Sequence, residues 1–214
     1  MANDKWANPQ KMWDQRFSEL EPVYGDAPNA FLRAQSARLK PGMKVLVPGD
    51  GYGRNGVWLA RQGLLVQTVD LSTVGVERAR KAARAAGLEM LIERANLSTW
   101  NWPVKEFDAI ASIFLHLPLE ERIKIHGLML RALRPGGFLI LEAFTPAQLQ
   151  YSSGGPKQVE LLYTADTLRG DFANAEVVEL IEAEVELDEG PMHRGPAAVV
   201  RGVFRRKRTG GKVY

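Results

Sequence analysis

Three glycines at two-residue spacing follow a short apolar segment, and a carboxylate closes the next one. Gly49, Gly51 and Gly53 come directly after the first segment, and Asp70 ends the second. Glycines permit positive φ and let a ligand approach the backbone without meeting a Cβ. A helix starting there directs free N–H groups at the ligand, and a carboxylate at the next strand end accepts bonds from both ribose hydroxyls. The spacing predicts a site for an adenosine-type cofactor.

These glycines fit two cofactor patterns. Gly51, Gly53 and Gly56 match the G-x-G-x-x-G of a dinucleotide turn, whereas the set beginning at Gly49 matches the turn of S-adenosylmethionine-dependent methyltransferases. In a dinucleotide turn the first glycine follows the strand at once, so a start at Gly51 would leave intervening residues unexplained. This register favours Gly49 as the first glycine, but the glycine pattern alone leaves both cofactors open.

The segments around the turn alternate strands with helices, which is typical of an α/β fold. We expect one Rossmann-like, doubly wound, mostly parallel seven-stranded sheet with an antiparallel C-terminal hairpin and helices on both faces. Strands are expected at 45–47, 66–70, 88–93, 107–113 and 138–142, with the hairpin turning at 190–196. Helices are expected at 6–20, 29–39, 73–86, 120–133 and 165–172, and another opens at Arg54.

No internal repeat or linker is evident, so residues 1–214 are expected to form a single domain. Within it, 1–40 is expected to be an N-terminal helical lid, 41–207 the core and 208–214 a basic tail. Residues 145–164 have the Ser, Gly and Pro content of a long mobile loop, and loops of this length are often functional lids.

Several motifs in sequence order resemble class I S-adenosylmethionine-dependent methyltransferases. They are GYGRNGVWLA with Asp70, the pair Asn96-Leu97, FDAIASIFLHLP at 107–118 and LRALRPGGFLILEAFTPAQ at 130–148. The GRN after the glycines, the N-terminal WDQRF and the late DEGPMHRG are closer still to the tellurite-resistance (TehB-like) branch. Asn96 departs from the acidic residue usual in this class, and its amide contact with adenine lacks charge assistance. Pro48 also departs, although a proline is tolerated where the strand ends.

The resemblance implies S-adenosyl-L-methionine as cofactor and S-adenosyl-L-homocysteine as product. In this family the N-terminal segment folds over the cofactor, where aromatic faces attract a sulfonium, and a guanidinium such as Arg54 suits the carboxylate of the methionine moiety. The residues expected to bind the cofactor are Trp13, Phe17, Tyr24, Gly49, Asp50, Gly51, Gly53, Arg54, Asn55, Asp70, Leu71, Asn96, Leu97, Ile113 and Phe114, with Arg16 beside them.

The acceptor side is expected to hold His116, Tyr151, His193 and Arg194. His116 follows the fourth strand, and His193 and Arg194 belong to the late motif, one as base or donor and the other to hold an anion. Their structural alternatives are a satisfied buried histidine and a solvent-facing turn. Methyl transfer needs an on-axis acceptor and exclusion of water, and it needs a base only if the acceptor arrives protonated.

Composition excludes several chemistries. The 214 residues contain no cysteine, so disulfides, cysteine metal sites and thiol nucleophiles are absent, including the covalent attack used on pyrimidine carbons. Three histidines without ligand spacing predict no metal site. No apolar run long enough to span a membrane and no signal peptide occur, so we expect a cytoplasmic protein.

Charge is distributed unevenly around a net value of +3. Residues 176–190 hold seven acids and no base, and 192–214 hold seven Lys or Arg and no acid. Adjacent antiparallel strands of opposite charge pair across the ladder, which predicts a charged hairpin. The alternative is that the basic run 205–208 binds nucleic acid or anionic lipid.

Three classes of function remain open. The leading hypothesis is methylation of a small-molecule acceptor: a thiol, a chalcogen oxyanion such as tellurite, or a heterocycle. The alternatives are an RNA or protein methyltransferase and a non-catalytic cofactor-binding protein. The loop after the fourth strand lacks the [D/N]-P-P-[Y/F] element of amino-methylating nucleic-acid enzymes, which disfavours a nucleic-acid partner. Neither a membrane partner nor an oligomeric state is predicted.

Overall fold

The computed structural model describes residues 8–19 and 22–208. Their seven strands form one sheet in the order β3-β2-β1-β4-β5-β7-β6, in which only β7 runs antiparallel to its neighbours. The expected fold class is therefore confirmed. The strands are β1 (Lys44–Pro48), β2 (Leu65–Asp70), β3 (Leu91–Arg94), β4 (Phe107–Ile113), β5 (Leu133–Phe144), β6 (Ala175–Asp188) and β7 (Arg194–Arg206).

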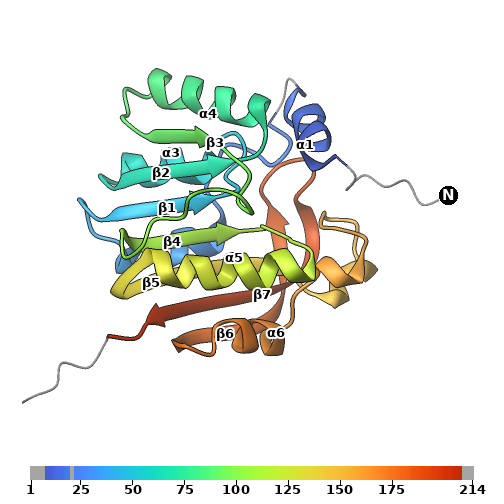
Figure 1. Ribbon diagram of the computed structural model, residues 1–214. Coiled ribbons are helices and arrows are strands. Elements are labelled where there is room, and N and C mark those ends of the chain that lie inside the picture. Colours follow the sequence, from blue (N-terminus) through green and yellow to red (C-terminus); the bar gives the residue numbers. More distant parts are fainter. Residues whose placement is uncertain (1–7, 20–21, 209–214) are drawn as a thin grey trace, which may run out of the picture.

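Helices cover both faces of the sheet (Figure 1). Helices α5 and α6 pack on one face with Phe107, Leu139 and Phe204, while α2 and α3 pack on the other with Val45 and Ile140. Helix α1 and the loop after β5 lie at the end to which the parallel strands point (Figure 1). The helices are α1 (Pro9–Phe17), α2 (Ala30–Ala34), α3 (Arg54–Arg61), α4 (Thr73–Ala85), α5 (Leu119–Ala132) and α6 (Ala165–Asp171), with 3₁₀ helices η1 (Ser36–Arg38), η2 (Pro146–Gln150) and η3 (Val159–Leu161).

Some expected boundaries are wrong. The helix expected at 29–39 ends at Ala34, and β3 begins at Leu91 instead of 88. Strand β5 begins at Leu133, which was expected to end a helix, and includes 134–137, which were expected to form a turn, because Leu133 pairs with Phe107 across an irregular register. The helix expected at 6–20 spans Pro9–Phe17, while 6–7, 20 and most of the tail lie outside the described residues.

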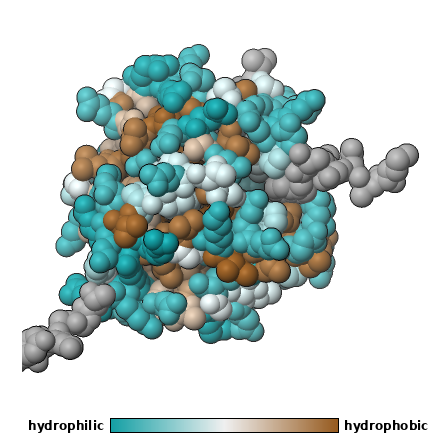
Figure 2. Space-filling view, in the orientation of Figure 1, coloured by the Kyte–Doolittle hydropathy of each residue, from teal (hydrophilic) through white to brown (hydrophobic). Residues whose placement is uncertain are grey.

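The charged hairpin is confirmed. Arg205 on β7 donates to both oxygens of Glu176 on β6, and Arg194 lies 3.5 Å from Asp188 near the turn. Strand β6 is the outer edge of the sheet and carries most of the acidic run. Across the face shown in Figure 2, hydrophobic patches lie between more numerous hydrophilic residues. No helix in the described part of the chain is long and apolar enough to cross a membrane.

Candidate cofactor and acceptor site

The glycine turn, residues 49–53, starts at the first position after β1. Gly49, Gly51 and Gly53 have φ of 69°, 59° and 90°, values that a side chain would strain, and α3 begins at the next residue. Asp70 at the end of β2 holds the turn in place: Oδ2 accepts from the Gly51 N–H and Oδ1 from the Ser72 N–H, both at 2.8 Å. The turn is thus pinned between two adjacent parallel strands.

The Asp70 carboxylate can accept further hydrogen bonds. Each of its oxygens accepts one of these backbone bonds, whereas a carboxylate oxygen accepts two. Burial raises the pKa of Asp70 above its usual value, so a hydrogen-bond donor reaching it would stabilise the charged form.

Helix α1 covers the glycine turn. The Phe17 ring lies directly on Gly51, where an added Cβ would be 2.7 Å from the Phe17 Cζ. Trp13 stacks on Phe17 with 5.5 Å between ring centroids. The Asp14 carboxylate accepts from Ser72 Oγ at 2.6 Å, which joins α1 to the start of α4. The N-terminal segment therefore lies over the turn, as the resemblance implied.

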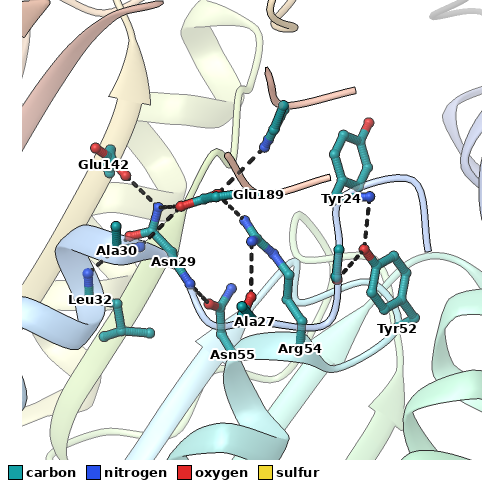
Figure 3. A network of polar contacts seen from close by, with 12 residues as sticks. Tyr24, Ala27, Asn29, Ala30, Leu32, Tyr52, Arg54, Asn55, Glu142 and Glu189 are labelled. Atoms are coloured by element: carbon teal, nitrogen blue, oxygen red, sulfur yellow. Dashed lines mark hydrogen bonds and ion pairs between the residues drawn. The ribbon is translucent and has the colours of Figure 1, made fainter. Parts of the chain in front are cut away.

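Tyr24 continues this cover toward the β6–β7 turn. Its hydroxyl accepts from Arg16 Nη1 at 2.8 Å, and its N–H donates to the Tyr52 hydroxyl at 2.9 Å (Figure 3). Gly25 and Gly190 meet so closely that a Cβ on Gly190 would be 2.3 Å from the Gly25 nitrogen. The cover and the late turn are consequently packed backbone to backbone.

Two residues expected to bind the cofactor have structural partners instead. Asp50 points under α3, where Oδ2 accepts from the Gly56 N–H at 2.9 Å and Oδ1 is buried without a partner. Burial, together with the charge of Asp70, raises the pKa of Asp50 to about 7. Asn55 accepts the Asn29 N–H through Oδ1 at 2.9 Å. Both side chains brace α3 from within.

Arg54 is bound to an acid that sequence reasoning did not select. Its Nη2 donates to Glu189 Oε2 at 2.8 Å, and its Nη1 donates to the Ala27 carbonyl at 3.2 Å (Figure 3). The two ion-pair side chains are only 7% and 6% exposed. The structural alternative for Arg54, an arginine held by a nearby acid, is what the structure shows.

Five residues from distant segments form one buried polar group, which we name the Glu189 cluster. Asn29 Nδ2 donates to both Glu189 Oε1 and Glu142 Oε2, so the amide bridges two carboxylates (Figure 3). Each carboxylate also meets an arginine. Burial alone would raise the pKa of Glu189, but its contacts with His193 and Arg54 outweigh it and lower the pKa to about 2. The cluster comprises Asn29, Arg54, Glu142, Glu189 and Arg201.

His193 lies beside the cluster among aromatic rings. It is 4% exposed, and its ring centroid is 4.5 Å from that of Tyr24, 4.7 Å from Phe114 and 5.6 Å from Phe144. Nδ1 is 3.7 Å from Glu189 Oε2 and has no hydrogen-bond partner. Burial lowers the pKa of His193 and the nearby carboxylate opposes that effect.

His116 has the features of a satisfied structural histidine. Its Nδ1 is 2.7 Å from the Leu161 carbonyl, and its Nε2 accepts from the Phe144 N–H at 3.3 Å. Burial lowers the pKa of His116 to about 4, so the ring is neutral near pH 7. Both ring nitrogens are bound to backbone groups, which disfavours His116 as a base.

The four residues expected on the acceptor side only partly converge. His116 and His193 both pack against Phe144, with centroid distances of 5.7 and 5.6 Å. The Arg194 side chain is 70% exposed and faces solvent beside Asp188. Tyr151 lies near Glu184, whose carboxylate raises the pKa of its phenol.

The remaining expected cofactor residues lie at the ends of β2 and β4 and in the loop after β3. Asn96 is exposed and its Oδ1 accepts from the Ser98 N–H, while Leu97 is buried and its carbonyl accepts from Trp102. Phe114 has φ of 50°, a strained value that is frequent at functional sites. Leu71 is half-buried after β2, and Ile113 is buried at the end of β4.

Sequence reasoning missed most of the Glu189 cluster. Asn29 had a readable signal, since an asparagine after proline caps α2 by accepting the Leu32 N–H. Glu142 had another, because an acid within an otherwise apolar strand needs a buried partner. Glu189 lies inside the late motif, but only His193 and Arg194 of that motif were expected to be site residues. In the described residues, no three His, Cys, Asp or Glu side chains are grouped to hold a metal ion.

The family comparison falls on the segment that contains the glycine turn. Residues 45–137 match a methyltransferase domain. Over 103 residues the chain is 34% identical to the methyltransferase GfsG of Streptomyces halstedii, which covers 47% of this chain and 37% of GfsG. The chain thus spans little more than a third of that curated relative's length.

Solved structures share the fold of nearly the whole chain. A structure reported for the conversion of a disulfide bond into a thioacetal group in echinomycin biosynthesis aligns with a TM-score of 0.74. It has 23% identity and covers 96% of this chain and 95% of that one. TehB from Haemophilus influenzae aligns with a TM-score of 0.69 at 18% identity, covering 92% and 67%. The TehB-like branch is one of many structural neighbours of this fold.

Proposed function

We propose that this protein is an S-adenosylmethionine-dependent methyltransferase acting on a small molecule. The observation that carries the proposal is that β1 ends at Pro48 and Gly49 follows at once, which is the register of the methyltransferase turn. The match at 45–137 supports the same conclusion. A GfsG-like relative and a TehB-like fold are consistent with a small acceptor, while tellurite as that acceptor and a cytoplasmic location remain predictions.

The residues of the glycine turn fit this cofactor. Asp70 has unused acceptor capacity for ribose hydroxyls, and the space that a Cβ on Gly51 would take is filled by the Phe17 ring. The Phe17 ring meets the turn with its edge and Trp13 stacks on Phe17, so aromatic groups that can attract a sulfonium cation lie beside the turn. When bound, S-adenosylmethionine supplies an electrophilic methyl group.

The residues of this chain position the reactants, exclude water and accept a proton where one must be removed. Helix α1 and Tyr24 cover the turn and keep solvent from it. His193, which packs against Tyr24 and Phe114, is a buried base candidate, whereas His116 is held by backbone partners. We assign His193 to accept a proton when the acceptor arrives protonated.

Nothing in the described residues favours a nucleic-acid acceptor. Arg205 is paired with Glu176, and Arg206 donates to carbonyls at the end of α5, so half of the basic run 205–208 is engaged within the molecule. A steep salt dependence of RNA binding would revive that alternative.

Calorimetry with S-adenosyl-L-homocysteine and with NAD tests the cofactor. We expect micromolar binding of the first and no comparable binding of the second, because the turn has the Gly49 register. The reverse preference would end the methyltransferase proposal. If the expected binding is found, a panel of thiols, chalcogen oxyanions and heterocycles with labelled S-adenosylmethionine then identifies the acceptor.

A further inference from the structure

The two carboxylate oxygens of Glu189 contact different groups. Oε1 accepts from Asn29 Nδ2 and from the Ala30 N–H, both at 3.0 Å, which anchors the carboxylate to the start of α2 (Figure 3). Oε2 accepts from Arg54 Nη2 at 2.8 Å and lies 3.7 Å from His193 Nδ1. The carboxylate is therefore fixed through one oxygen, while the other faces Arg54 and the His193 Nδ1 atom.

His193 Nδ1 is a buried ring nitrogen without a hydrogen-bond partner. Leaving such a group unpaired is unfavourable. Tyr24 and Phe114 hold the ring in place, and Glu189 Oε2 is the carboxylate oxygen that faces Nδ1. Because a carboxylate oxygen accepts two hydrogen bonds, the bond to Nδ1 is missing for reasons of distance and not of capacity.

We propose that Glu189 is a positioning residue for His193, and that its Oε2 passes from Arg54 to His193 Nδ1 when Arg54 engages another anion. The inference rests on the proposed function, in which that anion is the carboxylate of the cofactor's methionine moiety. An Nδ1–H bond to Oε2 leaves the lone pair on Nε2. Nε2 then takes the acceptor's proton, and the Glu189 carboxylate balances the imidazolium that forms.

Charged and titratable groups face His193 from several elements. Glu189 belongs to the same turn, Arg54 to α3 and Arg16 to α1, while His116 lies across Phe144. Burial is the main cause that lowers the pKa of His193, the two arginines add to it, and Glu189 opposes it. The titration and tautomer of this ring therefore report on the Arg54–Glu189 contact.

NMR of the imidazole nitrogens tests the inference without turnover, because the chain has only three histidines. In the unliganded protein we expect Arg54→Met to place the His193 proton on Nδ1 and to raise the pKa by about one unit. Arg54→Lys, which keeps the charge beside Glu189, should stay close to wild type. In the double variant Arg54→Met/Glu189→Gln, the pKa rise should shrink by more than half. His116 and His126 serve as internal controls for the fold.

An unchanged His193 tautomer in Arg54→Met, or an equal pKa rise in the double variant, would overturn the role of Glu189. If Glu189→Gln does not fold, the comparison of Arg54→Met with Arg54→Lys decides alone, since both keep the carboxylate. Adding S-adenosyl-L-homocysteine to wild type separates the two proposals. Binding without any change at His193 overturns this inference and leaves the proposed function standing. Absence of binding defeats the cofactor assignment, and the unliganded variants still decide the Glu189–His193 contact.

Discussion

The glycine turn and the Glu189 cluster adjoin at Arg54, which follows Gly53 and belongs to the cluster, yet they are assembled in different ways. The turn comes from one continuous segment, 44–72, in which β1, α3 and β2 follow one another. The cluster combines α2, α3, β5, β7 and the β6–β7 turn. Local spacing is enough to build the first, whereas the second exists only after the whole sheet has formed.

Their charges differ as well. In and beside the turn, burial raises the pKa of both Asp50 and Asp70. In the cluster each carboxylate meets an arginine, and the pKa of Glu189 falls to about 2, although burial still raises the pKa of Glu142. The turn is therefore prepared to receive donors or positive charge from a ligand, while the cluster is already neutralised and serves to hold neighbouring groups.

The largest expected effect is a loss of methyl-transfer activity without a loss of cofactor affinity, which would distinguish His193, beside the Glu189 cluster, from the glycine turn. His193→Ala should lower the methyl-transfer rate by roughly ten- to ten-thousandfold if this ring moves a proton, and leave cofactor affinity unchanged. Single-turnover assays with the acceptor found by screening give the rate, and calorimetry with S-adenosyl-L-homocysteine gives the affinity. Loss of affinity with unchanged rate would move His193 to the cofactor side.

The backbone contact between Gly25 and Gly190 tests how the cluster is held together. Gly190→Ala and Gly195→Ala both place a side chain at positive φ, with φ of 122° and 101°, which costs about 1–3 kcal/mol each. Only Gly190 meets backbone atoms, at 2.3 Å, while an added Cβ on Gly195 meets nothing within 4 Å. We expect Gly190→Ala to lose about 1–3 kcal/mol more in chemical denaturation. Equal losses of stability in the two variants would show that the Gly25–Gly190 contact accommodates an added side chain at little cost.

Asp70→Ala should reduce cofactor affinity by about 1.5–3 kcal/mol, the range for hydrogen bonds to a charged partner. Because Asp70 also holds the Gly51 and Ser72 N–H groups, part of the loss can come from a loosened turn. Asp70→Asn is the matched variant, since it keeps one acceptor oxygen and the size of the side chain. Calorimetry on both, with melting curves as a control for folding, measures the effect. Unchanged affinity in Asp70→Ala would place the ribose elsewhere.

The last expected effect is a pH dependence of stability from Asp50. Its pKa is raised from 3.8 to about 7, so the folded state binds a proton that the unfolded state has lost. The Asp50 contribution to the free energy of unfolding therefore falls as pH rises from about 4 to about 7. The free energy of unfolding of Asp50→Asn, relative to that of wild type, should therefore increase as pH rises across this window. A constant difference between the two in urea denaturation at several pH values would contradict the assignment.

The sequence was sufficient for the fold because its signals were local. Apolar strands, the glycines and the Ser72 cap each predict their own element, and alternating strands and helices lead to one sheet topology. The boundaries of α2 and β5 were wrong because tertiary pairing decided them: Leu133 pairs with Phe107 despite the Pro-Gly-Gly that follows it.

The site could be predicted only where it is contiguous. Gly49, Gly51 and Asp70 lie together as expected, since their positions follow from adjacent strands. Asn29 and Glu189 are far apart in sequence, and no sequence pattern around either residue identifies the other as its hydrogen-bond partner. Polar residues that satisfy each other over such separations follow from the folded topology alone.

Strand β6 has a consequence for how two molecules behave at high concentration. As the outermost strand it has one edge without a neighbouring strand in the described chain, and hydrophobic side chains such as Val177 and Ile181 are exposed on it. An open edge of this kind is a template for adding a strand from another copy. The glutamates along β6 make two such edges repel, so colloidal stability depends on their negative charge. Replacing these glutamates by glutamine removes that repulsion and favours aggregation through this edge.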